Sequence, residues 1–352
     1  MKLNKTKNKN IGIKEIAAHA NVSTGPVDKV LNNRGGVSKA THARILKAIE
    51  ELNYKPNMLA SRLKSKKQFT IAILIPKATE AIPFWYAHNK GFEQALEEFD
   101  QFGLNIDVLT FDQNSESSFK KNASKIIKGK YDGIFMVPIF YDQTVKLLAH
   151  FKSSNIPIIF FDSNISSQNN ISFIGQHSRD SGYLSANILS RCILSTDDIL
   201  IASISSKEDN PIQFSAREEG FRSFFAGSGR KIYTYENKTG GEGDIETEIV
   251  TLLKNKRSIR GIFATNGINK IAAVINGLRK KDFRLIGYDL IDENIFYLEL
   301  GIIDFLVSQQ PDKQAYNGIR LFYEYLILKQ KIQKSYYMPL DIVMKANLKY
   351  YL

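Results

Sequence analysis

The sequence has little chemistry that depends on cysteine, histidine or long apolar runs. Its 352 residues include a single cysteine, Cys192, and five histidines scattered along the chain. One cysteine cannot form a disulfide within the chain or a cysteine-based zinc cluster, and the histidines show no metal-ligand spacing. No stretch approaches the roughly 18 apolar residues of a membrane span, and no apolar run follows the basic N-terminus. We therefore expect a cytoplasmic protein with no metal and no membrane partner.

A nucleotide fingerprint and a catalytic motif are also lacking. The glycine-rich stretches Gly227–Gly229 and Thr239–Gly243 do not have the G-x-G-x-x-G spacing between a strand and a helix, so they are expected to be surface turns. No pairing of a nucleophile with a general base stands out. The sequence therefore predicts no cofactor and no enzymatic activity.

Positive charge is concentrated in the first fifth of the chain. Residues 1–67 contain twelve Lys and three Arg against four acidic residues, so they carry +11 of the total net charge of +12. Such a concentration is typical of a domain that binds a polyanion, and the helical pattern that follows favours DNA over a phospholipid surface. Residues 1–10 are rich in Lys and Asn and have no periodicity, so we interpret them as a disordered basic arm.

Residues 11–56 show the pattern of three short helices. One apolar stripe ends at Asn21, and a second follows Ser23, a good N-cap residue, with Pro26 in its first turn. Two such helices separated by a few residues form a helix-turn-helix, rather than a small bundle of another kind. A third helix is expected from the N-cap Ser38 to about Leu52. The residues expected to face the core are Ile13, Ile16, Ala17, Ala20, Val27, Val30, Leu31, Ile45, Leu46, Ile49 and Leu52.

This region resembles the DNA-binding domain of the lactose-repressor (LacI) family without a gap. The matching runs are Ile13–Ala17, Ala20–Ser23, Val27–Asn32, Val37–Ser38 and Glu51–Asn57. The run Met58–Lys64 resembles that family's hinge helix, which Asn57 would cap. Seven residues are too few for a stable isolated helix. The resemblance therefore implies a homodimer on a double-stranded DNA operator, with each hinge helix forming beside its twin.

The resemblance also assigns residues to DNA. The helix from about Thr24 to Asn32 would lie in the major groove, with Lys29 at the position where the family usually reads guanine with Arg. Leu63 matches the leucine that wedges into the minor groove and kinks the duplex. Asp28 stands where a Ser is common and is expected to pair with Lys29 or Arg34. The DNA-binding residues so implied are Lys14, Ser23, Thr24, Gly25, Lys29, Asn32, Arg34, Asn57 and Leu63.

From residue 69 onward, short apolar runs alternate with helical stretches. This alternation implies right-handed crossovers and a parallel sheet, and because it restarts near residue 178 it predicts two sheets in two lobes. Ligands of such sheets bind beyond the carboxyl ends of the strands, which places the candidate site in the cleft. Strands are expected at residues 70–75, 106–111, 133–137, 157–161, 199–203, 231–235, 261–264 and 284–287.

The order of elements over residues 69–345 resembles the type I periplasmic sugar-binding fold, which LacI-family proteins carry as their regulatory half. Polar residues at strand ends and helix starts would point into its cleft. Carboxylates accept, arginine donates in a fork and amides do both, which suits a monosaccharide or a related polyol. Two aromatic residues after the first strand would stack on a sugar ring. The ligand-binding residues so expected are Phe84, Trp85 (or an ordinary core residue), Asp162, Arg217, Asn266, Asp289 and Gln309, with Gln310 as the alternative to Gln309.

The predicted fold is therefore an all-α helix-turn-helix domain at residues 11–56, a hinge helix and linker at 57–68, and a two-lobed α/β domain at 69–352. That last domain would resemble a periplasmic binding protein, with two parallel doubly wound sheets. The N-terminal lobe is expected to comprise about 69–175 and 310–337, and the C-terminal lobe about 176–308 and 338–352.

The function predicted from these patterns is a sequence-specific transcription regulator of the repressor type, controlled allosterically by a small polar ligand. Two other functions fit part of the pattern. A sugar-binding transport or chemosensory protein would explain residues 69–352, but it needs export and has no use for a basic helix-turn-helix. A two-lobed α/β enzyme would need a catalytic constellation, which the sequence does not show.

Overall fold

The computed structural model describes residues 12–31, 34–52, 54, 67–80, 82–165, 170–204, 211–237, 244–278 and 282–352. The predicted residues Asn32, Asn57 and Leu63 lie outside these ranges. The chain divides into two compact units, residues 1–66 and 67–352, and each has a hydrophobic core of its own.

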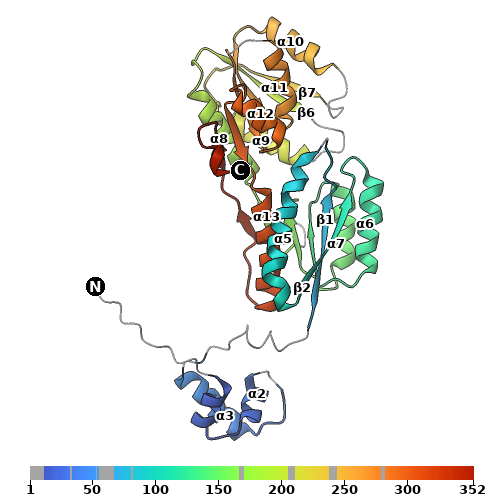
Figure 1. The fold of residues 1–352 in the computed structure, drawn as a ribbon, viewed down its shortest axis with the longest axis vertical. Coiled ribbons are helices and arrows are strands. Elements are labelled where there is room, and N and C mark those ends of the chain that lie inside the picture. Colours follow the sequence, from blue (N-terminus) through green and yellow to red (C-terminus); the bar gives the residue numbers. More distant parts are fainter. Residues whose placement is uncertain are drawn as a thin grey trace, which may run out of the picture. The chain divides into compact units, whose positions relative to one another are not determined.

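The first unit contains three helices, α1 (Ile13–His19), α2 (Thr24–Leu31) and α3 (Lys39–Glu51) (Figure 1). Ile16, Val27 and Ile45 are fully buried where the three helices meet. Ser38 caps α3 as expected, because its hydroxyl oxygen accepts a hydrogen bond from the backbone N–H of Thr41 at 3.3 Å. The cap satisfies one of the backbone donors that a helix leaves unpaired in its first turn.

One expectation for α3 is wrong, since Leu46 does not face the core. Its side chain is 49% exposed, whereas Ile45 and Ala48 are buried. A helix turns about 100° per residue because it has 3.6 residues per turn. The stripe that contains Ile45, Ala48 and Ile49 therefore turns Leu46 toward solvent.

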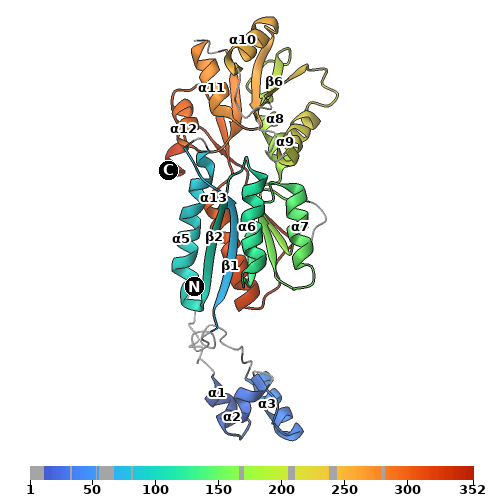
Figure 2. The ribbon, with the colours of Figure 1, turned by 90° about the vertical axis from the view of Figure 1, so that its right-hand side faces the viewer.

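The N-terminal lobe of the second unit has a six-stranded, all-parallel sheet in the order β11-β5-β4-β3-β1-β2. Helices α5 (Ala87–Phe99) and α13 (Pro311–Phe322) cover one face, and α6 (Glu116–Lys128) and α7 (Tyr141–Phe151) cover the other (Figure 2). The strands are β1 (Phe69–Pro76), β2 (Leu104–Phe111), β3 (Gly133–Met136), β4 (Ile158–Phe161), β5 (Ser172–Gly175) and β11 (Ser335–Tyr337).

The C-terminal lobe has a second six-stranded sheet, in the order β12-β10-β9-β8-β6-β7. Helices α8 (Ser178–Ser190) and α9 (Pro211–Phe224) cover one face. The other face is covered by α10 (Ile245–Asn255), α11 (Ile268–Gly277) and α12 (Asp292–Glu299). The strands are β6 (Asp198–Ile204), β7 (Ile232–Asn237), β8 (Ile259–Ala264), β9 (Arg284–Tyr288), β10 (Phe305–Ser308) and β12 (Asp341–Val343).

The chain crosses between the lobes three times, after β5, after β10 and after β11. Gln176 lies in the first crossing, and its Nε2 donates to the carbonyl of Ser308, at the second, and to that of Pro339, at the third, both at 2.8 Å. One buried amide thus joins all three crossing segments.

The expectation of purely parallel sheets is wrong for the last strand. β12 runs antiparallel to β10, with Leu306 opposite Val343. The parallel strands end at the edge that faces the other lobe, and β12 enters its sheet from that edge directly after β11. It must therefore run the opposite way. The structure also contains elements that the sequence patterns did not predict, namely strands β5, β10 and β11 and helix α12.

Candidate functional site

A large cavity lies between the two lobes of the second unit. Its volume is about 1040 Å³, and both lobes contribute to its wall. A cavity of this size between two α/β lobes is typical of a small-molecule site. The seven residues expected to bind ligand all line it, namely Phe84, Trp85, Asp162, Arg217, Asn266, Asp289 and Gln309.

Two of these residues end parallel strands in an unusual backbone conformation. Asp162 follows β4 with φ 62°, and Asp289 follows β9 with φ 77°. Left-handed conformations are strained for residues other than glycine and cluster at functional sites. The sharp turn at each strand end puts the two carboxyl groups, one from each lobe, at the cavity wall.

Arg217, on α9, is the buried centre of the polar network, with only 2% of its surface exposed. Its Nη1 donates to the carbonyl of Thr265 at 2.7 Å, and its Nη2 donates to Gln309 Oε1 at 2.9 Å. The amide of Gln309 in turn donates to Asp289 Oδ1 at 2.6 Å. Arg217 and Asp289 are therefore joined through Gln309, and Arg217 Nε has no hydrogen-bond partner among the described residues.

Tyr288 supports Arg217 from the side of the sheet. The guanidinium carbon lies 3.6 Å from the centroid of the Tyr288 ring, which is a close cation–π contact. The Tyr288 hydroxyl is hydrogen-bonded to Ser181 Oγ on α8 at 2.8 Å. The ring that carries the guanidinium is thus itself fixed by α8, the helix that follows the first crossing.

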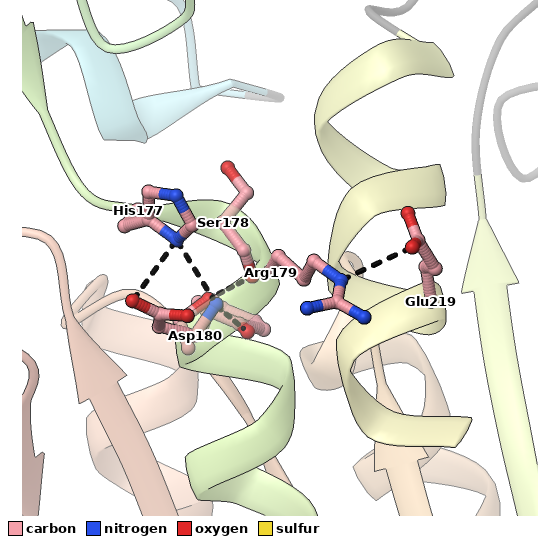
Figure 3. A network of polar contacts seen from close by, with 7 residues as sticks. His177, Ser178, Arg179, Asp180 and Glu219 are labelled. Carbon is pink, nitrogen blue, oxygen red and sulfur yellow. Dashed lines mark hydrogen bonds and ion pairs between the residues drawn. The ribbon is translucent and has the colours of Figure 1, made fainter. Parts of the chain in front are cut away.

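Helices α8 and α9 pack closely because each has a glycine at the contact. A Cβ on Gly182 would lie 1.9 Å from the carbonyl oxygen of Arg217, and one on Gly220 would lie 1.8 Å from that of Arg179. An ion pair between Arg179 Nε and Glu219 Oε1 at 3.1 Å joins the same helices (Figure 3). This close packing sets the position from which Arg217 reaches the cavity.

The environment of the two acids raises their pKa values. Burial raises the pKa of Asp162 to about 7, although the positive charge of Arg217 and a hydrogen bond from Ser163 act against it. Burial also raises the pKa of Asp289, which Arg217 and Gln309 partly offset. Perturbed carboxyl groups in a cleft are typical of binding sites.

Three of the remaining expectations are refined by the contacts. The side chain of Asn266 pairs with the backbone of Ile204, accepting from its N–H at 2.9 Å and donating to its carbonyl at 2.6 Å, so it holds the end of β6. Trp85 lines the cavity and is also a core residue, 6% exposed, with its indole N–H donated to Gln113 at 3.0 Å. Gln309 lines the cavity, whereas Gln310 donates to Asp341 at 2.7 Å outside it.

Several cavity residues were not on the list of candidates. Ser163 directly follows Asp162 in the sequence, and Gln213 shortly precedes Arg217. Their closeness to two predicted ligand-binding residues could have identified them. Phe296 and Tyr297 come from α12, which the sequence did not predict, and no pattern pointed to them.

In the first unit, the described candidates for DNA contact lie on the surface, namely Lys14, Ser23, Thr24, Gly25, Lys29 and Arg34. Four of these belong to α2 or directly precede it. Arg34 pairs with Asp28 at 3.4 Å, so the expectation for Asp28 is confirmed. In the described part of the chain, no helix is long and apolar enough to cross a membrane.

Comparison with known proteins identifies both units. Residues 71–331 match the family described as periplasmic binding protein domain, and residues 12–57 match the bacterial regulatory proteins of the lacI family. A repressor named PurR from Haemophilus influenzae (strain PittEE) is 28% identical over 296 residues, which cover 81% of this chain and 83% of that one. Catabolite control protein A from Priestia megaterium is 26% identical, over 80% of this chain and 82% of that protein.

Solved structures agree with this assignment. A putative LacI transcriptional regulator from Bacteroides fragilis is 27% identical with a TM-score of 0.74, and the match covers 81% of this chain and all of the other. A carbohydrate transporter solute binding protein from Agrobacterium radiobacter, in complex with D-arabinose, shares the fold at 19% identity and a TM-score of 0.68, over 81% and 97% of the two chains. The chain therefore belongs to the periplasmic binding protein domain family and, with its lacI-family domain, is a DNA-binding transcription regulator of the lacI family.

Proposed function

We propose that this regulator is a cytoplasmic repressor that binds its operator as a homodimer and is controlled by a sugar or a related polyol bound between the lobes. It acts by binding and not by catalysis, as do the relatives whose names describe them as repressors. The proposed working parts are the helix-turn-helix at residues 11–56, the hinge at 57–68 and the two-lobed domain at 69–352.

The network around Arg217 is the observation that carries the ligand proposal. It brings a carboxylate from each lobe, an arginine and an amide to one cavity wall. Polyol hydroxyls both donate and accept, so they match a wall that offers both kinds of partner. Phe84 and Trp85 supply an apolar surface for a ring.

The surface of α2 supports the DNA proposal. Thr24, Gly25 and Lys29 are exposed on or at the start of this helix, in a unit that carries most of the net charge of the chain. We propose that Lys29 donates to a guanine edge and that Asn57 and Leu63 act in the hinge. A transport protein remains the second candidate for residues 69–352, but the lacI-family domain at residues 12–57 has no role in it.

The proposal is tested by selecting an operator from random DNA and measuring its affinity with and without a panel of aldopentoses and aldohexoses. At least one sugar should change operator affinity. Arg217→Ala should abolish that change, because it removes the centre of the network, while operator affinity without sugar stays within a few fold of wild type. A variant that responds like wild type would place the ligand elsewhere.

A further inference from the structure

The hydrogen-bond donors and acceptors that the cavity wall leaves unpaired determine which class of effector can bind there. Asp162 Oδ2 accepts from Ser163 at 3.1 Å, and Asp289 Oδ1 accepts from Gln309 at 2.6 Å. The second oxygen of each carboxyl group receives no hydrogen bond from any residue that the structure describes. Each lobe therefore offers the cavity an acceptor that needs a donor from the ligand.

The arginine on the same wall is already engaged by the protein. The two terminal nitrogens of Arg217 already donate to Thr265 and Gln309. One face of the guanidinium is covered by Tyr288. An arginine binds a phosphate or a carboxylate most strongly through two parallel N–H bonds. After these bonds each terminal nitrogen keeps only one N–H, so the guanidinium has fewer donors left for an anion than a free arginine has.

The charges around the cavity point the same way. The described residues that line it include five acidic side chains, Glu80, Asp162, Asp289, Asp292 and Glu293, against two cations, Arg217 and Lys270. Even with Asp162 protonated, as its raised pKa of about 7 allows, the acids outnumber the cations. Like charges brought together in a binding site repel one another and weaken binding. An anionic ligand would add to this excess, whereas hydroxyl and ammonium groups would pair with it.

We propose that the effector carries no anionic group, and that Asp162 and Asp289 select a donor-rich neutral or amine-bearing polyol and reject its phosphorylated and uronic acid counterparts. This inference rests on the proposed function and narrows its ligand class. The two acids come from opposite lobes, so a ligand that donates to both would join the lobes, while an anion would hold them apart.

The single tryptophan of the chain makes a direct test possible, because Trp85 lines the cavity. Its emission is followed in the full chain during titration with matched sets: ribose and ribose 5-phosphate; arabinose and arabinose 5-phosphate; glucose, glucosamine, glucose 6-phosphate and glucuronate; galactose, galactosamine and galacturonate. Every binder should be neutral or amine-bearing, and its anionic counterpart should bind about 100-fold more weakly. Any anionic sugar that binds as tightly as its neutral parent overturns the inference.

Asp289→Asn tests the cause of the selection. The variant keeps the size of the side chain and removes one charge. The affinity gap, which is the ratio of the affinity for a neutral sugar to that for its anionic counterpart, should therefore shrink to about 10-fold. Asp142→Asn removes an exposed charge on α7 that does not line the cavity, and should leave the gap unchanged. An unchanged gap in Asp289→Asn overturns the inference.

The two proposals fail differently. An anionic sugar that binds and changes operator affinity overturns the charge inference alone and leaves the proposed function standing. If no sugar of any charge changes Trp85 emission or operator affinity, both are overturned.

Discussion

Arg217 is the residue on which most of the cavity wall depends. Its guanidinium is held by a carbonyl, an amide and an aromatic face, yet its Nε lacks a partner among the described residues. A buried donor without a partner costs roughly 1–3 kcal/mol. The other contacts of the guanidinium must offset this cost, so Arg217 depends on Thr265, Gln309 and Tyr288 for its position.

Asp162 leads to a prediction about pH. Burial raises its pKa from 3.8 to about 7. The folded protein therefore keeps a proton that the unfolded chain has lost, and the stability this provides is full below pH 3.8 and is lost as the pH rises through about 7. The free energy of unfolding of wild type minus that of Asp162→Asn should fall by up to a few kcal/mol over this range.

Urea unfolding at a series of pH values measures this difference. Asp142→Asn, which removes an exposed carboxylate, serves as the control and should show no comparable trend. A difference between wild type and Asp162→Asn that rises with pH would show that the carboxyl group is stabilised in its charged form.

For single residues, the sequence predicted a position at the cavity correctly where the residue directly follows a strand. Asp162 and Asp289 end apolar runs, and strand ends of parallel sheets meet at one edge, so their place at the cavity could be predicted. The engagement of Asn266 with Ile204 could not be predicted, because it depends on the distance between two strand ends. Leu46 was wrongly predicted to face the core, because an apolar residue next to the apolar stripe of a helix can face either the core or solvent.

The elements α8 and α9 show how helix packing places a residue of the cavity wall. Gly182 and Gly220 allow the two backbones to touch, and Ser181 fixes the ring beneath Arg217. The position of Arg217 therefore depends on side chains that do not line the main cavity.

Gly182→Ala should destabilise residues 67–352 by about 3 kcal/mol, because the new methyl group would overlap the backbone of α9 and overpacking has a cost of this order. Gly277→Ala, at the end of α11, is the matched control: its Cβ would meet nothing closer than 3.9 Å, so it should be neutral or stabilising by about 0.5 kcal/mol. Urea unfolding of both variants checks the prediction. Equal stabilities would mean that α8 and α9 can separate without loss.

The limits of sequence reasoning at this scale are topological. Short, continuous apolar runs identified eight strands, since a parallel sheet buries both faces of its strands. The short strands β11 and β12 have three residues each, which is too few for a period to be recognised. The direction of β12 depends on where the chain enters the second sheet, and this is a property of the whole lobe pair.

At the scale of the whole molecule, the three crossings determine how the lobes can move. Gln176 ties them together, and helix α8, with its contacts to Tyr288 and Arg217, begins two residues later. A change in lobe arrangement would therefore alter both the crossing segments and the network around Arg217. An effector shifts such an equilibrium only by binding one arrangement better than the other.

Coupling between effector and operator must then be reciprocal. If a sugar changes operator affinity by some factor, saturating operator must change the affinity for that sugar by the same factor, because both measure one coupling free energy. Trp85 emission gives sugar affinity with and without operator, and filter binding gives operator affinity with and without sugar. Residues 67–352 alone, a compact unit with its own cores, should bind the sugar without any effect of operator. Unequal factors in the full chain would mean that the sugar and the DNA do not act on the same pair of states, and the lobe arrangement would lose its place as the link between them.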